Sequence, residues 1–240
     1  MTDQDAAKHA AAEHAVGLIE PGMVVGLGSG TTATIFIQLL GAKVQGGLQI
    51  RGIASSDGSE QLARSLGIAI TDFDHAMAID VAVDGADEIA PDGRGGMALI
   101  KGGGGQLLRE KIVASAAKRF LIVADDSKLV RTLGKFPLPV EVIPMAAPLV
   151  VAHLRTLGFE PHLRAAKVGI GPYITDEGNV ILDCASGGIA DPAKTAADIR
   201  NIVGVVEHGL FLGMAERALI AGPGGVRNLA AADIAAALPA

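Results

Sequence analysis

Apolar and polar positions follow a strand–helix rhythm over the first half of the chain. The expected helices are residues 5–20, 33–40 and 106–118, and a further one that ends at Leu66. The expected strands between them are short apolar runs: residues 23–27, 49–54, 68–71, 80–83, 97–100 and 120–124. Strands that alternate with helices over this distance predict a mainly parallel sheet covered on both faces.

The rhythm changes after Lys128. A Pro-bearing connector leads to an alternating strand at 140–143, a helix at 147–157, a hairpin with strands at 173–175 and 180–182, and a helix at 193–202. We therefore expect a Rossmann-like α/β domain of residues 1–134 plus 206–240, with a smaller α+β domain of residues 135–205 inserted. Apolar runs at 210–211 and 218–220 are expected to rejoin the first domain as buried strands.

Composition narrows the classes of function. Half of the 240 residues are apolar, which provides for a full core, and the formal net charge is −6. With no Trp and a single Tyr, the chain lacks the basic patches and stacking platforms that nucleic acids need. Cys184 is the single cysteine, so an internal disulfide is excluded. No run approaches the roughly 18 apolar residues of a membrane span, and we expect a soluble, cytoplasmic protein.

A glycine–hydroxyl loop, Gly26 to Thr32, follows the first expected strand. Its glycines permit a sharp turn and expose N–H groups at a helix N-terminus, where the dipole favours an anion. Ser29, Thr31 and Thr32 add hydroxyl donors that suit a phosphate. Two alternatives stay open: a plain capped turn, and a dinucleotide loop in which Thr31 occupies the third glycine position.

Three acids, Asp84, Asp87 and Glu88, follow the apolar run at 81–83. Three carboxylates in five residues repel one another unless solvent, a cation or a ligand compensates. A solvated turn, a magnesium site, and a site that bonds sugar hydroxyls and moves protons all fit this spacing.

Lys101 opens into four consecutive glycines, with Glu110 about one and a half turns into the helix that they begin. Four glycines cost backbone entropy, so close approach to a ligand or unusual backbone angles are expected in return. Lys101 could stabilise an oxyanion and Glu110 could act as a general base. The alternative for Glu110 is an ordinary surface glutamate. Lys128, after the strand at 120–124, is a candidate second cation for a phosphate.

The chain resembles ribose-5-phosphate isomerase, type A, over nearly its whole length. The resemblance is carried by residues 83–88, 101–104, 109–111 and 135–142, and by the segments 26–32 and 209–211. It implies a Rossmann-like domain with an inserted α+β domain, in homo-oligomers that are dimers or tetramers. It also implies interconversion of D-ribose 5-phosphate and D-ribulose 5-phosphate in the pentose phosphate pathway, with neither a metal nor an organic cofactor.

The resemblance also implies roles for particular residues. Glu110 matches the base that moves a proton between C1 and C2, and Lys101 matches the cation beside the enediolate oxygen. Asp84 and Asp87 match acids that contact the sugar and assist ring opening. The other expected substrate contacts, mostly around the phosphate or along the loops, are Ser29, Gly30, Thr31, Thr32, Gly85, Ala86, Gly102, Gly103, Gly104, Lys128 and Lys8.

The chain departs from the family pattern at Gly105–Gln106, where small apolar residues are common, and at the turn 55–59, to which we assign no role. Two other functions remain open from the sequence. An NAD-dependent dehydrogenase would use the loop at 26–30, and saturable NAD binding would reveal it. A non-catalytic sugar-phosphate sensor would bind ligand without isomerising it, although a sensor has no need of the Lys101–Glu110 pair.

Overall fold

The computed structural model describes residues 3–238, and its largest element is a seven-stranded sheet in the order β14-β13-β7-β4-β1-β2-β3. Neighbouring strands are parallel except in the terminal hairpin of β13 and β14. The strands are β1 (Val24–Leu27), β2 (Arg51–Ala54), β3 (Ala69–Ile70), β4 (Ile79–Asp84), β7 (Ala117–Asp125), β13 (Arg217–Gly222) and β14 (Gly225–Ala230). The predicted α/β class with a mainly parallel, Rossmann-like sheet is confirmed.

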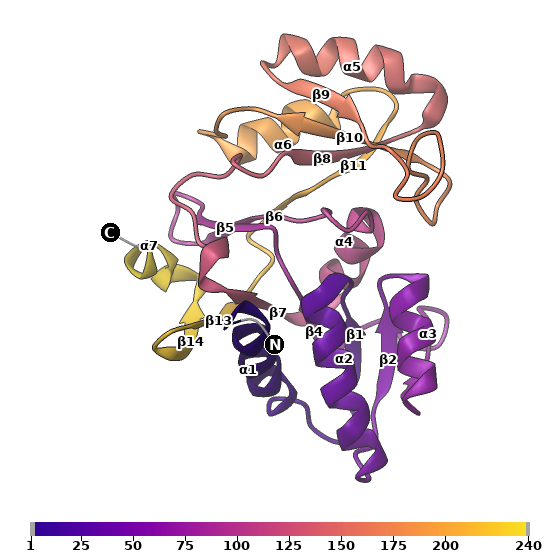
Figure 1. Cartoon of the computed structure of the whole chain (residues 1–240), viewed down its shortest axis with the longest axis vertical. Coiled ribbons are helices and arrows are strands. Elements are labelled where there is room, and N and C mark those ends of the chain that lie inside the picture. Colours follow the sequence, from indigo (N-terminus) through magenta and orange to yellow (C-terminus); the bar gives the residue numbers. More distant parts are fainter. Residues whose placement is uncertain (1–2, 239–240) are drawn as a thin grey trace.

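Helices cover this sheet on both faces, as its buried strands require. In Figure 1, α1 and α2 lie in front of it in the lower part of the molecule, and their apolar residues share one core with alternate residues of β1, β4 and β7. The remaining strand residues form a second core with α4 and α7. The helices are α1 (Asp3–Val16), α2 (Gly30–Gln45), α3 (Asp57–Ser65), α4 (Leu107–Ser115), α5 (Ala147–Thr156), α6 (Pro192–Arg200) and α7 (Ile234–Ala237).

A three-stranded antiparallel sheet forms a middle layer (Figure 1). It consists of β5 (Glu88–Pro91), β6 (Met97–Ile100) and β12 (Leu210–Leu212). Because successive side chains of a strand point to opposite faces, Leu99 and Phe211 pack on the main sheet, whereas Ile100 and Leu210 pack on the upper part. The strand at residues 88–91 was not predicted from the sequence, and β6 and β12 lie in this antiparallel sheet and not in the parallel one.

The upper part of the molecule is an antiparallel sheet in the order β11-β8-β10-β9, packed against α5 and α6 (Figure 1). Its strands are β8 (Leu138–Val142), β9 (Glu160–Leu163), β10 (Val180–Ala185) and β11 (Val205–His208). The expected hairpin of residues 173–175 and 180–182 is wrong in detail. The strand β10 pairs with β9, and the 173–175 segment forms a single bridge with β10, between Ile174 and Val180. The strand β9 is an exposed edge strand that contains Pro161, so it lacks apolar alternation. The domain boundaries near residues 135 and 205 stay a prediction.

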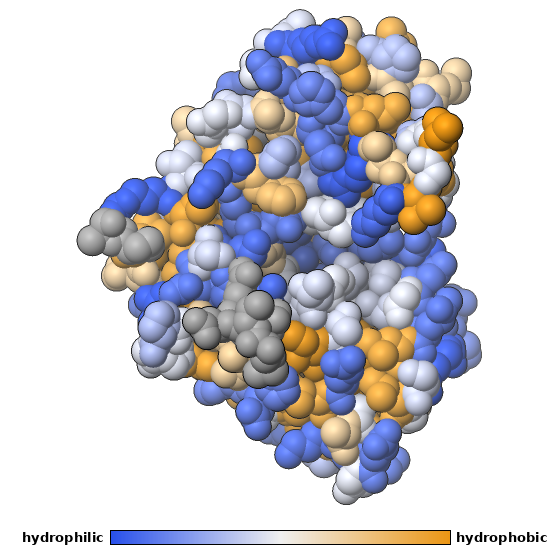
Figure 2. Space-filling model, viewed as in Figure 1, coloured by the Kyte–Doolittle hydropathy of each residue, from blue (hydrophilic) through white to orange (hydrophobic). Residues whose placement is uncertain are grey.

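Polar residues gather along the hollowed band between the upper and lower parts (Figure 2). In the main sheet, β1 is flanked by β2 on one side and by β4 on the other, so the chain reverses its winding direction beside β1. Ligands of open α/β sheets bind at such a switch point, beyond the carboxyl ends of the strands. Among residues 3–238, no helix combines the length and the apolar character needed to cross a lipid bilayer.

Candidate active site

The loops that leave β1 and β4 are bonded to each other at the switch point. The N–H of Gly28 donates to Val83 O at 3.0 Å, and the N–H of Ser29 donates to Oδ1 of Asp84 at 3.1 Å. A Cβ atom at Gly28 would lie 2.3 Å from the Asp84 side chain. Glycine is therefore required at position 28 so that the Asp84 carboxylate can lie against the backbone of this loop.

The helix α2 begins at Gly30, directly after this loop, with Ser29 as its N-cap residue. The Ser29 side chain does not cap the helix; its hydroxyl donates to Oε1 of Glu110 at 2.5 Å. Thr31 and Thr32 in the first turn line the pocket. The helix N-terminus therefore presents N–H and hydroxyl donors to the pocket, which suits an anion.

Gly103 and Gly105 of the glycine run pack too closely for larger side chains. A Cβ at Gly103 would lie 2.7 Å from Oδ1 of Asp87, and a Cβ at Gly105 would lie 2.4 Å from the Tyr173 hydroxyl. The N–H of Gly103 donates to Oδ2 of Asp87 at 2.8 Å. The helix α4 begins only at Leu107, so Glu110 lies in its first turn; the expected one and a half turns is wrong, because the turn 102–105 precedes the helix.

Lys101, Asp84 and Glu110 form a buried charge cluster, with side chains only 3–4% exposed. The Lys101 Nζ lies 2.9 Å from Oδ2 of Asp84 and 3.3 Å from Oε2 of Glu110, and it donates to Gly85 O at 2.7 Å. Within the described part of the chain, Oε2 of Glu110 receives no hydrogen bond. The cluster thus holds one carboxylate oxygen that is buried, beside an ammonium group, and open to a further partner.

Burial and charge shift the protonation equilibria of this cluster. Burial raises the pKa of Asp84 to about 7, although the Lys101 ammonium opposes the shift. Burial also raises the pKa of Asp87, against the N–H bond from Gly103. For Lys101, burial alone would lower the pKa, but the facing carboxylates of Asp84 and Glu110 raise it above its ordinary value. The lysine is therefore a permanent cation that several carboxylates share.

A single pocket gathers the sequence-predicted residues. Lys8 reaches it from α1, and Lys128 from the short turn after β7. Asp84 does not line it; its buried carboxylate contacts the Lys101 ammonium and the N–H groups of Ser29 and Gly85. The lining residues are Lys8, Ser29, Gly30, Thr31, Thr32, Gly85, Ala86, Asp87, Lys101, Gly102, Gly103, Gly104, Glu110 and Lys128. Among residues 3–238, no group of three or more His, Cys, Asp or Glu side chains is arranged to hold a metal ion.

Comparison with known proteins identifies the family. The sequence model of ribose 5-phosphate isomerase A (phosphoriboisomerase A) matches residues 51–225. The chain belongs to the ribose-5-phosphate isomerase A family. A relative of that name from Roseiflexus sp. strain RS-1 is 49% identical over 230 residues, which are 95% of this chain and 97% of the relative.

Solved structures of ribose-5-phosphate isomerases share the fold. The isomerase A of Methanocaldococcus jannaschii is 40% identical with a TM-score of 0.89, and the match covers 94% of this chain and 99% of that one. A D-ribose-5-phosphate isomerase in complex with phospho-erythronic acid is 38% identical with a TM-score of 0.91, covering 95% of this chain and 100% of that one.

In this ribose-5-phosphate isomerase A family member, Glu88 lies apart from Asp84 and Asp87, the other two acids at the end of β4. Glu88 is buried at the start of β5 and accepts N–H bonds from Gly134 at 2.7 Å and Phe136 at 2.6 Å. It therefore anchors the connector to the upper sheet and does not reach the pocket. The expectation of a three-acid turn is corrected to two acids at the site and one structural acid.

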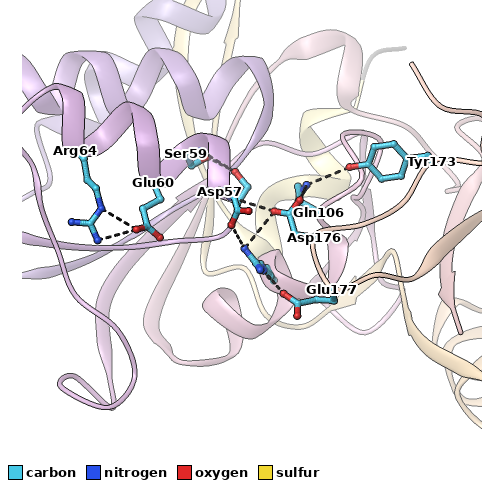
Figure 3. Close-up of polar contacts among 10 residues, drawn as sticks. Asp57, Ser59, Glu60, Arg64, Gln106, Tyr173, Asp176 and Glu177 are labelled. Carbon is cyan, nitrogen blue, oxygen red and sulfur yellow. Dashed lines mark hydrogen bonds and ion pairs between the residues drawn. The ribbon is translucent and has the colours of Figure 1, made fainter. Parts of the chain in front are cut away.

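Sequence reasoning missed the polar network around α4 (Figure 3). Arg109, next to Glu110, pairs with Asp57 of α3 at 2.6 Å, with Asp176 at 3.4 Å and with Glu177. Gln106 donates to Asp176 at 3.2 Å. The turn 55–59 also has a structural role, because the Ser59 hydroxyl donates to Gly28 O at 2.6 Å. Nothing in the local sequence signals these contacts, which join segments up to 70 residues apart.

Proposed function

We propose that this chain interconverts D-ribose 5-phosphate and D-ribulose 5-phosphate through an enediolate, as a step of the pentose phosphate pathway. Family membership supports this activity, and so does the relative that binds phospho-erythronic acid, a phosphorylated sugar acid. The observation that carries the proposal is the open, buried Oε2 of Glu110 beside the Lys101 ammonium in a pocket lined by donors.

Glu110 acts as the base. A hydrogen on carbon next to a carbonyl group is a very weak acid, so its removal needs a positioned base and stabilisation of the developing oxyanion. The Ser29 hydroxyl fixes Oε1 of Glu110 and leaves Oε2 to approach the substrate. One carboxylate can take the proton from C2 of the aldose and return it to C1, and the ketose results when the hydroxyl proton of O2 is also transferred to O1.

Lys101 stabilises the oxyanion of the enediolate. Its ammonium is held by Asp84 and by the carbonyl of Gly85, so it is oriented before the substrate arrives. A charge that is already in place costs no reorganisation during the reaction. Asp84 acts through Lys101, since it is buried and does not line the pocket. Asp87 lines the pocket, and its raised pKa suits a group that exchanges protons with sugar oxygens during ring opening.

The phosphate binds at the other end of the pocket. Lys8 and Lys128 supply cations, and Thr31 and Thr32 lie in the first turn of α2, whose dipole and N–H groups favour an anion. Binding energy from this remote group holds the reacting carbons against Glu110 and thus contributes to the rate.

We also propose that the protein works in the cytoplasm as a homo-oligomer, a dimer or a tetramer. Support comes from exposed apolar side chains beside α5: Met145 is 88% exposed, Leu149 67% and Val203 92%. Exposed apolar patches commonly mark protein–protein contacts. Light scattering of the purified protein during size-exclusion chromatography measures the number of copies.

The decisive experiment is an isomerisation assay in deuterated water with EDTA present. Purified protein and ribose 5-phosphate should yield ketopentose phosphate that carries solvent deuterium on C1, because the proton on Glu110 exchanges with solvent in the enediolate state. NMR detects both the product and the label. A protein that makes no ketose contradicts the proposed function, whereas ketose made without label shows that Glu110 returns the proton to C1 before it exchanges with solvent.

A further inference from the structure

Arg164, which follows β9 in the upper sheet, reaches the glycine run from outside the pocket. Its Nη1 donates to Gly102 O at 3.0 Å and to Gly103 O at 3.3 Å. Its Nε and Nη2 donate to the two carboxylate oxygens of Asp183 at 2.9 and 2.5 Å. The Arg164 side chain is only 14% exposed. A guanidinium group fixed by a two-point carboxylate contact is a rigid donor.

These contacts fix the direction of two peptide groups. In a planar trans peptide the C=O and the following N–H point in opposite directions, and the described residues contain no cis peptide bond. With Gly102 O and Gly103 O directed at Arg164, the N–H groups of Gly103 and Gly104 point to the opposite side of the loop. On that side the Gly103 N–H donates to Asp87 at 2.8 Å, and both glycines line the pocket.

We propose that Arg164, held by Asp183, is a positioning residue that orients the glycine run for catalysis. Through the peptide group between Gly102 and Gly103, it fixes the direction of the Gly103 N–H, which donates to the Asp87 carboxylate. Through the next peptide group it presents the Gly104 N–H, which has no acceptor within residues 3–238, to an oxygen of the bound sugar. The inference rests on the proposed isomerase function and adds a residue that touches no substrate.

Within the glycine run the Gly105 N–H donates to Gly102 O at 3.0 Å, and Arg164 adds bonds that glycine residues, which have no side chains, cannot supply. Glycine populates many backbone conformations at similar energy, and Gly104 has only the Ser29 hydroxyl within 4.0 Å of its Cβ position. Two successive N–H groups on one side of a loop form a concave donor site for negative oxygen. Lysine at position 164 would be a point charge and would lack the fork that spans Asp183 and two carbonyl groups.

The test compares Arg164→Met, Arg164→Lys and Asp183→Asn with the matched control Arg119→Met. Arg119 pairs with Glu216 at 2.8 Å at the start of β7 and does not line the pocket. Each variant is assayed for kcat and KM per folded molecule, for its unfolding midpoint, and for amide hydrogen exchange of Gly103 and Gly104. The exchange rates are read without substrate, so they test the hold on the loop even if the wild-type protein were not an isomerase.

We expect kcat of Arg164→Met to fall about 10- to 100-fold, the cost of a misplaced catalytic geometry. Arg164→Lys and Asp183→Asn should lose less, and Arg119→Met should retain the wild-type kcat. Amide exchange of Gly103, whose N–H is bonded to Asp87, should be faster in Arg164→Met than in the control, whereas Gly104, whose N–H has no acceptor among residues 3–238, serves as an unprotected reference. Asp87, which also faces Lys101, Glu110 and Lys128, loses its fixed donor, so the acidic limb of the kcat/KM profile should move to higher pH.

A folded Arg164→Met protein with kcat within about twofold of wild type and unchanged exchange would overturn the inference. So would a loss of activity that only follows the unfolded fraction. If Arg164→Met does not fold, the same measurements on Asp183→Asn decide. This variant keeps Arg164, keeps the volume of the side chain at position 183, and removes only the carboxylate charge. A wild-type protein without isomerase activity would contradict the proposed function instead, and the exchange data would still stand.

Discussion

Glu110 is an ordinary glutamate in sequence and an unusual one in structure. Its neighbours in the chain are Arg109 and Lys111, a context typical of a solvated helix surface, yet it is 5% exposed. Burial results from the first turn of α4 lying against the loop after β1, where Ser29 bonds one of its oxygens. The buried environment of Glu110, the proposed base, is therefore set by contacts with residues far away in the sequence.

Glu110→Gln should abolish turnover and leave substrate binding mostly intact. The amide keeps the shape and can still accept from Ser29, but it cannot take a proton, and general-base catalysis contributes roughly 10²–10⁴-fold. Kinetics with ribose 5-phosphate and calorimetric titration with a phosphorylated sugar acid measure the two effects. A variant that kept more than a few per cent of the wild-type rate would place the base elsewhere.

Lys101→Ala should lower kcat about 10²–10³-fold and change KM much less, because the ammonium acts on charge that develops in the transition state. Lys128→Ala is the matched control: it removes a pocket-lining lysine at the phosphate end and should mainly raise KM. Both variants need a check of folding, since Lys101 also compensates Asp84. A pure KM effect in Lys101→Ala would move this residue to a binding role.

At the scale of elements, the glycine run is a spacer between β6 and α4 whose members are not equivalent. Gly105→Ala should lower the free energy of unfolding by roughly 1–3 kcal/mol, the usual cost of a non-glycine residue in a left-handed conformation, because its φ is +99° and its Cβ would meet Tyr173. Gly104→Ala, with open space at its Cβ, should unfold like the wild type. Urea denaturation compares the two, and equal stabilities would contradict this account.

The sequence predicted the elements that build the site better than those that support it. Apolar runs followed by glycines or acids locate the ends of β1, β4 and β6, and parallel pairing brings the first two together. The strand β5 was hidden by its acid and its proline, and Glu88 looked like a third site acid. Arg164 lies after an exposed edge strand, and its contacts with the glycine run span 61 and 62 residues. No local periodicity encodes such contacts.

At the scale of the whole molecule, the site lies where three layers meet. Lys8 comes from the first helix, Lys101 from the middle sheet and Glu110 from α4, while Arg164 reaches down from the upper sheet. The upper sheet returns to the middle layer at His208, where Lys111 of α4 donates to His208 O at 2.6 Å. This junction links the upper part of the molecule to α4, the helix that carries Glu110.

The junction should weaken in mild acid, because His208 is buried and burial, together with the nearby Lys111 ammonium, lowers its pKa to about 4 from 6.5. Between these values the unfolded chain binds a proton that the native protein does not, so this stabilising contribution is present above pH 6.5 and is lost as pH falls toward 4. The stability of wild type relative to His208→Gln should therefore decrease from pH 7 to pH 5, by about 1–2 kcal/mol. Urea unfolding at the two pH values measures the change.

Asp84→Asn is a control for which the stability difference from wild type should change with pH in the opposite direction. The pKa of Asp84 is raised to about 7 from 3.8, so its contribution is largest at low pH and is lost as pH rises through 7. The stability of wild type relative to Asp84→Asn should therefore decrease from pH 5 to pH 7. Groups far from the replaced residue titrate alike in both proteins of each comparison, so their contributions cancel, and the measured change belongs to the replaced residue together with its charged neighbours. If the difference in stability between wild type and His208→Gln does not vary with pH, His208 has the same pKa in the folded and in the unfolded protein.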